Sequence, residues 1–541
     1  MRVCHILTNP YSYDNRVRKE CEHLVSMGFD VHVVALKSDA THKAFEVING
    51  VKVHRTDGRS PLLATLGRLL VRIPLALSGR SDWVGRSVGN VIRVVRVNFV
   101  QESSFRGKVS KLMRMIRLVY PKNLIQRKSA HSEDELEEAL REEVAFTPGQ
   151  KLKVVVLLSA GVFLAPFLFI GFLASKILFF VFGKLNRSLK PLARLIRRKF
   201  NNLIPQYVRR LNYLEKALYL QADVYQANDW DTLGVTYLSS KIVGSNFVYD
   251  SHELYDESFP NRKSLLQRAY IRALEQFYAR RAAEVVTVSN EIARVLKQRY
   301  RLRNAPIVVR NIQPLVKFEK SDDDHSFHDL IGVENEMRIV VYAGLITNGR
   351  GLEELLRAAT LMDESAVVVI MGPSRGYDEH LKRIASEMGV LNKKVYILDP
   401  VPPDKLPCLL QDAYVGVITT PTSVLSYYYG LSNKMFSYVQ SGVPIISIDH
   451  PEKASFIRTF DVGLLIQDNR PECIADAVNY LISSPWERDR LSKNCLEAAA
   501  NEINWQKEVQ KYERVYVRMY ERLLFGKPLT QTDQPIGEAA C

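Results

Sequence analysis

Short apolar runs alternate with amphipathic helical segments from the start of the chain. The opening residues predict the order strand, helix, strand, strand, at Arg2 to Thr8, Arg16 to Met27, Val31 to Leu36 and Val51 to Arg55. Asp14 and Asn15 precede the helix, where such side chains cap helices, and Gly28 stands where a helix commonly ends. This order is typical of an α/β domain, and it lacks the G-x-G-x-x-G turn of dinucleotide-binding domains.

The same alternation returns after Asn212 and continues in two blocks. Strands of the first block are predicted at Asp223 to Ala227, Asn246 to Tyr249, Val285 to Val288 and Ile307 to Val309. Strands of the second block are predicted at Arg338 to Tyr342, Ala366 to Met371, Val395 to Leu398, Val415 to Ile418 and Pro444 to Ile448. A polar linker, Ser321 to His328, separates the blocks, and Asn504 to Leu524 predicts a long amphipathic helix.

These blocks predict two α/β domains, each with a Rossmann-like sheet. The first domain is assigned residues 1–58 and 205–318, and the second domain is assigned residues 332–525. Residues 59–204 form an insertion in the first domain, and the polar residues 526–541 are expected to be a disordered tail.

Positive charge is concentrated in the insertion. The net charge of the 541 residues is +15, yet residues 59–210 alone hold 28 Lys and Arg against 9 Asp and Glu. Such a region fits an anionic partner, and the candidates are nucleic acid and an anionic membrane surface. The six cysteines are scattered without a C-x-x-C pair, which argues against a zinc site and fits a reducing compartment. The N-terminus reads directly as a strand, so no cleavable signal peptide is expected.

The insertion contains an apolar run, Val154 to Phe182, with one charged residue and with Pro166 near its middle. Its 29 residues exceed a single membrane segment but are too few for two spans of about 20 residues each. Because the first domain continues on both sides of the run, we favour a re-entrant or shallow helical hairpin held on anionic lipid, and no nucleic-acid partner. The alternatives are one span paired with Pro61 to Leu77, which Arg68 and Arg72 make costly, and a buried hairpin of a soluble protein.

The strand at Asn246 to Tyr249 ends in four polar residues, Asp250, Ser251, His252 and Glu253. Ligands of open parallel sheets bind beyond the carboxyl ends of the strands. Histidine can donate, accept or carry charge near neutral pH, so this segment is a candidate for catalysis. The alternative is an ordinary loop between a strand and a helix, in which a Ser or Asp side chain caps the helix.

Several local patterns occur along the chain in a fixed order. They are Asp14-x-Arg16-Val17-x-Lys19-Glu20, Asn228-Asp229-Trp230, Asp250-Ser251-His252-Glu253, Val288-Ser289-Asn290-Glu291, Arg310-Asn311, Gly344 to Gly351, and Gly430 to Tyr438 with Gly442-Val443-Pro444. In this order they resemble glycosyltransferase family 4, and in particular a bacterial branch of it, over residues 1–58 and 205–525. The resemblance implies the GT-B fold, in which two Rossmann-like domains face each other across a cleft.

The resemblance also implies an activity. It is that of a hexosyltransferase-like enzyme that moves a sugar from a nucleotide-sugar donor with retention at the anomeric carbon. The basic, apolar insertion points to a lipid-linked or surface-polysaccharide acceptor of the cell envelope, at the cytoplasmic face of the plasma (inner) membrane. No cofactor or metal is expected, because fixed cations and helix N-termini can stabilise the departing nucleoside diphosphate.

The predicted site residues fall into three groups. The predicted catalytic residues are His252, Glu253 and Asp14, and His252 is expected to hydrogen-bond the donor sugar. The predicted donor-binding residues are Gly344, Arg350, Gly351, Asn433, Lys434 and Ser437, with the glycines admitting the diphosphate and the two cations binding it. Asn15, Arg16 and Asp229 are predicted on the acceptor side. For Gly344 to Gly351 a plain loop is the alternative interpretation.

The chain departs from the family pattern at several positions. The arginine of the family's G-R-x-x-x-x-K-G stretch falls at Leu345, and Arg350 stands in place of its lysine. The two glutamates of the E-x7-E pattern, which orient the sugar and hold the nucleotide ribose, fall at Tyr429 and Ser437. Tyr11 to Asn15 replaces a glycine-rich turn. These losses leave a second function open, a catalytically inactive GT-B scaffold that takes part in assembly at the membrane.

Overall fold

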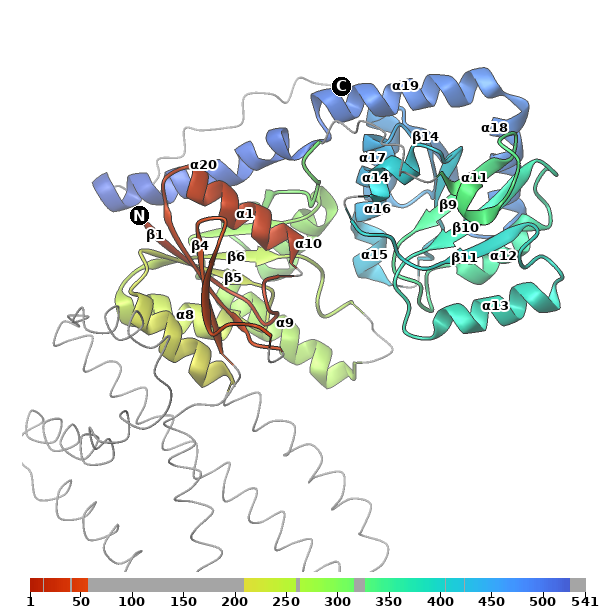
Figure 1. Ribbon diagram of the computed structural model, residues 1–541. Helices are drawn as coiled ribbons and strands as arrows, with labels where there is room; N and C mark the ends of the chain where they lie inside the picture. Colours follow the sequence, from red (N-terminus) through yellow and green to blue (C-terminus); the bar gives the residue numbers. More distant parts are fainter. Residues whose placement is uncertain are drawn as a thin grey trace, which may run out of the picture.

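The computed structural model describes residues 1–56, 209–258, 263–315 and 326–525, except Tyr13, Asp39, Ala40, Asp404 and Ser423. The predicted insertion, with its hydrophobic hairpin at 154–182, and the predicted tail at 526–541 lie outside these residues. Two α/β units, each built on its own sheet, make up the described part (Figure 1). Within these ranges, no helix combines the length and apolar character that a membrane crossing requires.

The first sheet has eight strands in the order β3-β4-β2-β1-β5-β6-β7-β8. They are β1 (Arg2–Ile6), β2 (Asp30–Leu36), β3 (Phe45–Ile48), β4 (Val51–Thr56), β5 (Val224–Asn228), β6 (Asn246–Ser251), β7 (Glu284–Thr287) and β8 (Ile307–Val308). All neighbouring pairs are parallel except β3 and β4. Because β1 pairs with β5, segments from both sides of the insertion complete one sheet.

Strand β3 is not predicted by the apolar pattern. Its Phe45 and Val47 side chains are 40% and 58% exposed at the edge of the sheet, so no buried face marks the strand. The signal that could have revealed it is the Asn49-Gly50 turn that joins it to β4. Both turn residues have positive φ, 49° and 82°, as a tight hairpin of this kind requires.

Helices cover both faces of the first sheet. One face carries α1 (Asn15–Ser26) and α20 (Trp505–Phe525). The other face carries a helix over residues 209–220, α8 (Leu233–Val243), α9 (Leu265–Ala279) and α10 (Asn290–Tyr300). Successive side chains of a strand point to opposite faces, so Val3 packs in the first of these cores and Cys4 in the second.

The second sheet has six parallel strands in the order β11-β10-β9-β12-β13-β14. They are β9 (Arg338–Ala343), β10 (Ala366–Met371), β11 (Val395–Leu398), β12 (Val415–Ile418), β13 (Ile445–Ile448) and β14 (Gly463–Ile466). The edge strand β14 is short and half-buried, and the sequence pattern does not predict it.

Helices also cover both faces of the second sheet. One face carries α12 (Leu352–Ala359), α13 (Tyr377–Glu387) and α18 (Pro471–Ser483). The other carries α11 (Phe327–Ile331), α14 (Leu406–Leu410), α16 (Asn433–Gln440), α17 (Pro451–Phe460) and α19 (Pro485–Asn501). The short helix α15 (Leu425–Tyr429) lies toward the first domain, against α10.

The last helix corrects one predicted domain boundary. We assigned residues up to 525 to the second domain, but α20 packs on the sheet of the first domain beside α1 (Figure 1). The hydroxyls of Tyr512 and Tyr516 both donate to Oε1 of Gln226 on β5. The helical period of Asn504 to Leu524 was correctly recognised, but an amphipathic pattern does not identify the sheet that its apolar face covers.

Direct hydrogen bonds join the two domains beside the cleft. The carboxylate of Glu452 accepts from the backbone N–H of Asn290 at 3.0 Å and of Glu291 at 2.9 Å, at the start of α10. An acidic group at a helix N-terminus is stabilised by the exposed N–H groups there. The hydroxyl of Ser289 donates to the carbonyl of Tyr429 at 2.8 Å. These contacts join the start of α10 in the first domain to α15 and α17 in the second domain.

Candidate active site

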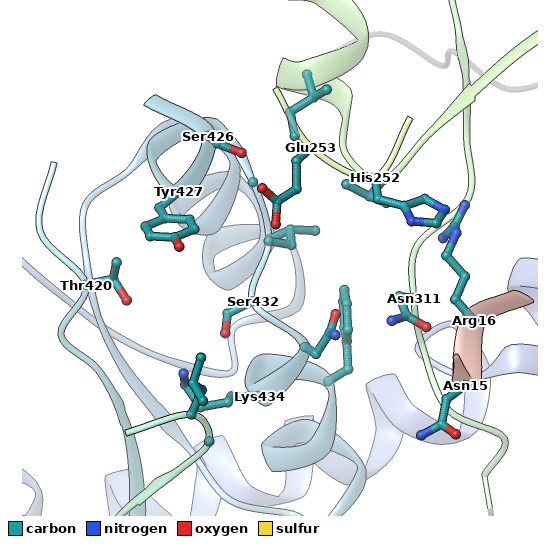
Figure 2. Close-up of a pocket in the computed structure, with 18 of the residues that line it drawn as sticks. Asn15, Arg16, His252, Glu253, Asn311, Thr420, Ser426, Tyr427, Ser432 and Lys434 are labelled. Atoms are coloured by element: carbon teal, nitrogen blue, oxygen red, sulfur yellow. The ribbon is translucent and has the colours of Figure 1, made fainter. Parts of the chain in front are cut away.

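A cavity of about 640 Å³ lies between the two domains and is lined by both. Nine of the predicted site residues line it, namely Asp14, Asn15, Arg16, His252, Glu253, Gly344, Arg350, Asn433 and Lys434. Asp229, Gly351 and Ser437 do not. Figure 2 shows Glu253 and His252 facing the cavity from the first domain and Ser432 and Lys434 from the second. The strand ends of two separate sheets thus meet at one site.

His252 lies between two carboxylates. Its Nδ1 is 2.9 Å from Oδ1 of Asp229, and its Nε2 is 3.0 Å from Oδ2 of Asp250. Burial opposes the charged form of the ring, but these two carboxylates overcome the effect and raise the pKa of His252 well above its usual value. The ring is therefore an imidazolium with both N–H groups engaged.

This pairing differs from the role that we expected for His252. Neither ring nitrogen is available to hydrogen-bond a donor sugar, because both point at carboxylates. The side chain instead brings a fixed positive charge to the cavity wall. The sequence placed Asp229 on the acceptor side, but the structure places it behind His252, where it also accepts from the hydroxyl of Tyr255.

A buried arginine continues this chain of charges. Arg16 on α1 donates from Nε and Nη2 to the two oxygens of Asp250, at 3.0 and 2.9 Å. Its Nε is also 3.1 Å from Oε1 of Glu20, and its Nη1 donates to the carbonyl of Val309 at 2.7 Å. Burial raises the pKa of Asp250, but the positive charges of Arg16 and His252 lower it by more. The net pKa of Asp250 is therefore below its usual value. Although Arg16 lines the cavity, its donors are committed to the protein.

Asp14 is engaged in local structure. Its Oδ1 accepts from the backbone N–H of Val17 at 3.1 Å, which caps α1, and its Oδ2 accepts from the side chain of Asn9 at 2.7 Å. The turn before it contains Tyr11 with φ of 71°, a conformation that favours glycine. The chain thus adopts a glycine-like turn without the glycine, and a catalytic role of Asp14 stays a prediction.

Glu253 is the carboxylate that points into the cavity (Figure 2). Among the residues that the structure describes, none donates a hydrogen bond to its side chain. Burial raises its pKa, and the nearby charge of Asp229 adds to the rise, whereas His252 and Arg350 oppose it. Glu253 is therefore placed to accept hydrogen bonds from a bound molecule.

The second domain contributes three cations to the cavity. The guanidinium of Arg350 lies over the ring of Tyr427, with Cζ 4.3 Å from the ring centre, and Nη2 donates to its hydroxyl at 3.3 Å. The ammonium of Lys434 lies 4.2 Å from the ring centre of Tyr342. The ammonium of Lys453 on α17 donates to the carbonyl of Tyr427. Arg350, Lys434 and Lys453 are called the cation cluster below.

Among the described residues, the cation cluster has no acidic partner. No carboxylate of the described ranges lies within ion-pair distance of Arg350, Lys434 or Lys453. Burial lowers the pKa of Lys434 to about 7, and the positive charges of Arg350 and Lys453 act in the same direction. The pKa of Lys453 is also lowered to about 7, by burial and by Arg350, with Glu452 opposing. Such a cluster is complementary to a multiply charged anion.

Two glycines shape the loop that carries Arg350. Gly351 has φ of 71°, and a Cβ there would lie 2.1 Å from the carbonyl oxygen of Thr419, whose hydroxyl donates to the carbonyl of Arg350 at 2.8 Å. A Cβ on Gly344 would lie 2.9 Å from Cδ of Lys434. The absence of a side chain on Gly344 therefore leaves room for the Lys434 side chain beside the end of β9. Helix α12 begins directly after Gly351, and no side chain caps its first N–H groups.

Lys453 is a candidate site residue that sequence reasoning missed. It follows Asp449, His450 and Pro451 at the end of a predicted strand, a polar strand end with a proline that signals the start of a helix. That signal was present, but a lysine on a helix is normally exposed, whereas Lys453 is buried and donates to the carbonyl of Tyr427.

The positions of the two missing glutamates are occupied differently. Tyr429 packs against the core of the first domain that contains Ile292, and its carbonyl accepts from Ser289. Ser437 donates to the carbonyl of Asn433 within α16 and does not line the cavity. The donor-binding role predicted for Ser437 therefore has no support in its position.

The fold is that of a known class. Sucrose-phosphate synthase from Thermosynechococcus elongatus is similar to this chain with a TM-score of 0.58 and 13% identity, over 96% of this chain and 99% of that chain. A sequence model described as "Glycosyl transferases group 1" matches residues 337–484, and one described as "Glycosyltransferase Family 4" matches residues 183–310. This chain is related to the GT-B glycosyltransferases. The expected α/β GT-B fold is confirmed.

Individual relatives of this GT-B chain are distant. An uncharacterised glycosyltransferase of Methanocaldococcus jannaschii is 20% identical over 259 residues, which is 48% of this chain and 64% of the relative. The D-inositol 3-phosphate glycosyltransferase of Corynebacterium diphtheriae is 26% identical over 194 residues, which is 34% of this chain and 44% of the relative. In both cases the GT-B chain spans less than two thirds of the relative's length.

Proposed function

We propose that the protein is a glycosyltransferase that binds a nucleotide-sugar donor with its diphosphate on the cation cluster. The observation that carries this proposal is the cluster itself, with three buried or half-buried cations around one cavity and no carboxylate partner among the described residues. A bound diphosphate would supply the negative charge that pairs with these three cations. The named relatives are glycosyltransferases, which supports the same class of reaction.

The proposed reaction is transfer with retention at the anomeric carbon, as a hexosyltransferase. The acceptor hydroxyl oxygen bonds to C1 of the sugar while the bond from C1 to the β-phosphate oxygen breaks. The electron pair leaves with the diphosphate, and the hydroxyl proton passes to that departing oxygen. Arg350, Lys434 and Lys453 stabilise the charge on the leaving group, so the transfer is proposed to need no metal.

The first domain has a different proposed part. The imidazolium of His252 faces the cavity as a fixed cation, and Glu253 accepts hydrogen bonds from sugar hydroxyls. Asn15 and the backbone around Arg16 form the wall on the acceptor side. The acceptor is proposed to be a lipid-linked or surface-polysaccharide chain of the cell envelope, met at the cytoplasmic face of the plasma membrane, because the sequence of residues 59–210 is basic around an apolar run.

Nucleotide binding tests the donor site. Removing Arg350 with Arg350→Ala is expected to weaken the binding of UDP or GDP by about 10- to 100-fold, since a hydrogen bond to a charged group contributes about 1.5–3 kcal/mol. Calorimetry on the full-length, detergent-purified protein measures this change. The control is Arg357→Ala on α12, the helix that follows the Arg350 loop, where the arginine is exposed. Equal affinity for wild type and Arg350→Ala would contradict the proposed site.

A second candidate function is a GT-B scaffold without catalysis, which Tyr429 and Ser437 favour because they replace the expected glutamates. Nucleotide binding without turnover separates it from the enzyme. Sugar release or transfer from the bound donor, in the presence of membrane lipid extract, would exclude the scaffold.

Affinity for nucleoside diphosphate is expected to fall as pH rises above about 7. The pKa values of Lys434 and Lys453 in the empty site are lowered to about 7, and a bound diphosphate raises them again. Binding near neutral pH therefore takes up protons, and affinity decreases by up to about tenfold per pH unit for each lysine above its pKa. Calorimetry in two buffers of different ionisation enthalpy measures the uptake. Unchanged affinity between pH values on either side of 7 would show that the lysines do not contact the anion.

A further inference from the structure

The outer face of α9 is unusually apolar. Leu265, Leu266, Tyr270 and Phe277 are 79%, 84%, 55% and 44% exposed, and these four residues are called the α9 stripe below. Leu266, Tyr270 and Phe277 are spaced by four and seven residues, which places them along one side of a helix. The small residues Ala269 and Ala273 lie on the same exposed side. Several large exposed apolar side chains on one helix face mark an interaction surface.

The exposure of the stripe is a property of an ordered helix. Ser264 and Gln267 form a capping box at the start of α9. The opposite side of the helix is anchored in the first domain by Ile271, Glu275 and Ala279, which are all buried. The helix is therefore fixed in an orientation that turns the stripe to the outside.

The charges around the stripe are positive. The single acidic residue of α9 is Glu275, which is buried and accepts from the hydroxyls of Tyr249 and Tyr300. The helix ends in exposed Arg280 and Arg281, and the guanidinium of Arg281 lies 3.6 Å from the ring centre of Phe277. Leucine and aromatic side chains flanked by arginine are the composition of helices that lie in the interface of anionic membranes.

The position of α9 also connects it with the basic part of the chain. Tyr278 on α9 lies near α8, with its ring centre 5.3 Å from that of Tyr237. Arg210, where the described chain resumes after residues 57–208, is close enough to Tyr278 for its charge to oppose the rise that burial causes in the tyrosine pKa. The last basic residue of the sequence 59–210 therefore lies near α9.

We propose that the α9 stripe docks on an anionic lipid bilayer, with the leucines and aromatic rings in the interface and the arginines on the lipid phosphates. This surface is independent of the donor site and does not rest on the proposed activity. Arg272 on α9 donates to Asp256 at 2.7 Å, and Arg268 donates to Glu257. Both acidic residues lie in the segment that follows His252.

Photochemical crosslinking identifies what covers the stripe. The full-length protein carries p-benzoylphenylalanine in place of Tyr270 and is irradiated with vesicles of equimolar phosphatidylglycerol and phosphatidylcholine. We expect adducts with lipid, and none from the same photoreactive residue in place of Trp486, which is 68% exposed on the second domain. Adducts of position 270 with another segment of the same chain, or with a second copy, would overturn the proposal.

A vesicle-binding measurement gives an independent result. The double variant Leu266→Glu with Tyr270→Glu is expected to lower the partition coefficient of the full-length protein by about tenfold or more, because each of these side chains buries substantial apolar area. The control is Trp486→Glu. Unfolding midpoint and nucleotide binding of the double variant should equal those of the wild type, which shows that it is folded. An unchanged partition coefficient in that folded variant would refute membrane docking through α9.

Discussion

Replacing Asp250 with asparagine is expected to reduce the free energy of unfolding by about 3–5 kcal/mol, the range for breaking a buried ion pair. Asp250 accepts from two nitrogens of Arg16 and from His252, and all three contacts are lost or weakened in Asp250→Asn. The remaining carboxylate beside Arg16 is Glu20, with Oε1 3.1 Å from Nε, and burial raises its pKa to about 7 in the wild type. Arg16 would then be a buried cation with a weak partner.

The pH dependence of this effect has a definite sign. The folded-state pKa of Asp250 is lowered, so its contribution to stability is present above the pKa of the unfolded state and is lost as pH falls through the folded value. The pKa of His252 is raised, so its contribution is lost as pH rises through its folded value. Both contributions are present near pH 6.

Guanidinium unfolding of the full-length protein in detergent measures the loss. The matched control is Asp468→Asn, which breaks the surface ion pair of Asp468 with Arg470 at 2.9 Å and should cost less than about 1 kcal/mol. A nuclear magnetic resonance titration of His252 should also show a lower pKa in Asp250→Asn. Equal destabilisation by the two substitutions would mean that the buried chain of charges does not stabilise the fold.

Combining Lys453→Met with Arg350→Ala is expected to weaken the binding of UDP or GDP by about 1000-fold, close to complete loss at ordinary concentrations. Each cation alone is expected to contribute about 10- to 100-fold. The two are not fully independent, because Arg350 donates to the hydroxyl of Tyr427 and Lys453 donates to its carbonyl. A double-mutant cycle measures that coupling.

The control for the lysine is Lys493→Met. The Lys493 side chain is 79% exposed on α19 and far in sequence from the cavity residues, so its loss should leave nucleotide affinity unchanged. If Lys453→Met alone bound nucleotide as tightly as the wild type, the anion would rest on Arg350 and Lys434, and Lys453 would be a structural residue of the domain interface.

The sequence predicts most of the strands because buried parallel strands are continuous apolar runs. The runs that become β6 and β10, for example, are recognisable without the structure. The edge strand β3 escapes this reasoning, because its exposed side gives it no buried apolar run. The other edge strand, β14, is an apolar run of four residues, so its signal was present and was missed. The sequence also does not identify the sheet on which α20 packs, because the apolar face of that helix fits either sheet.

The site residues divide in the same way. His252, Glu253, Arg350 and Lys434 follow strand ends or a glycine loop, and all four line the cavity. The pairing of His252 with two carboxylates depends on β5 and β6 being neighbours, and the chain order alone does not give that adjacency. The burial of Lys453 depends on the packing of α17 against the segment that contains Tyr427, a tertiary effect that a single sequence does not reveal.

The path of α20 gives the protein two covalent crossings between its domains. The chain passes from the first domain to the second between Leu315 and Ser326, and it returns between α19 and α20. Two covalent connections restrict the relative motion of the domains to rotation about the line that joins the connections. A truncation before Trp505 would remove one connection and would also uncover the face of the first sheet that α20 covers.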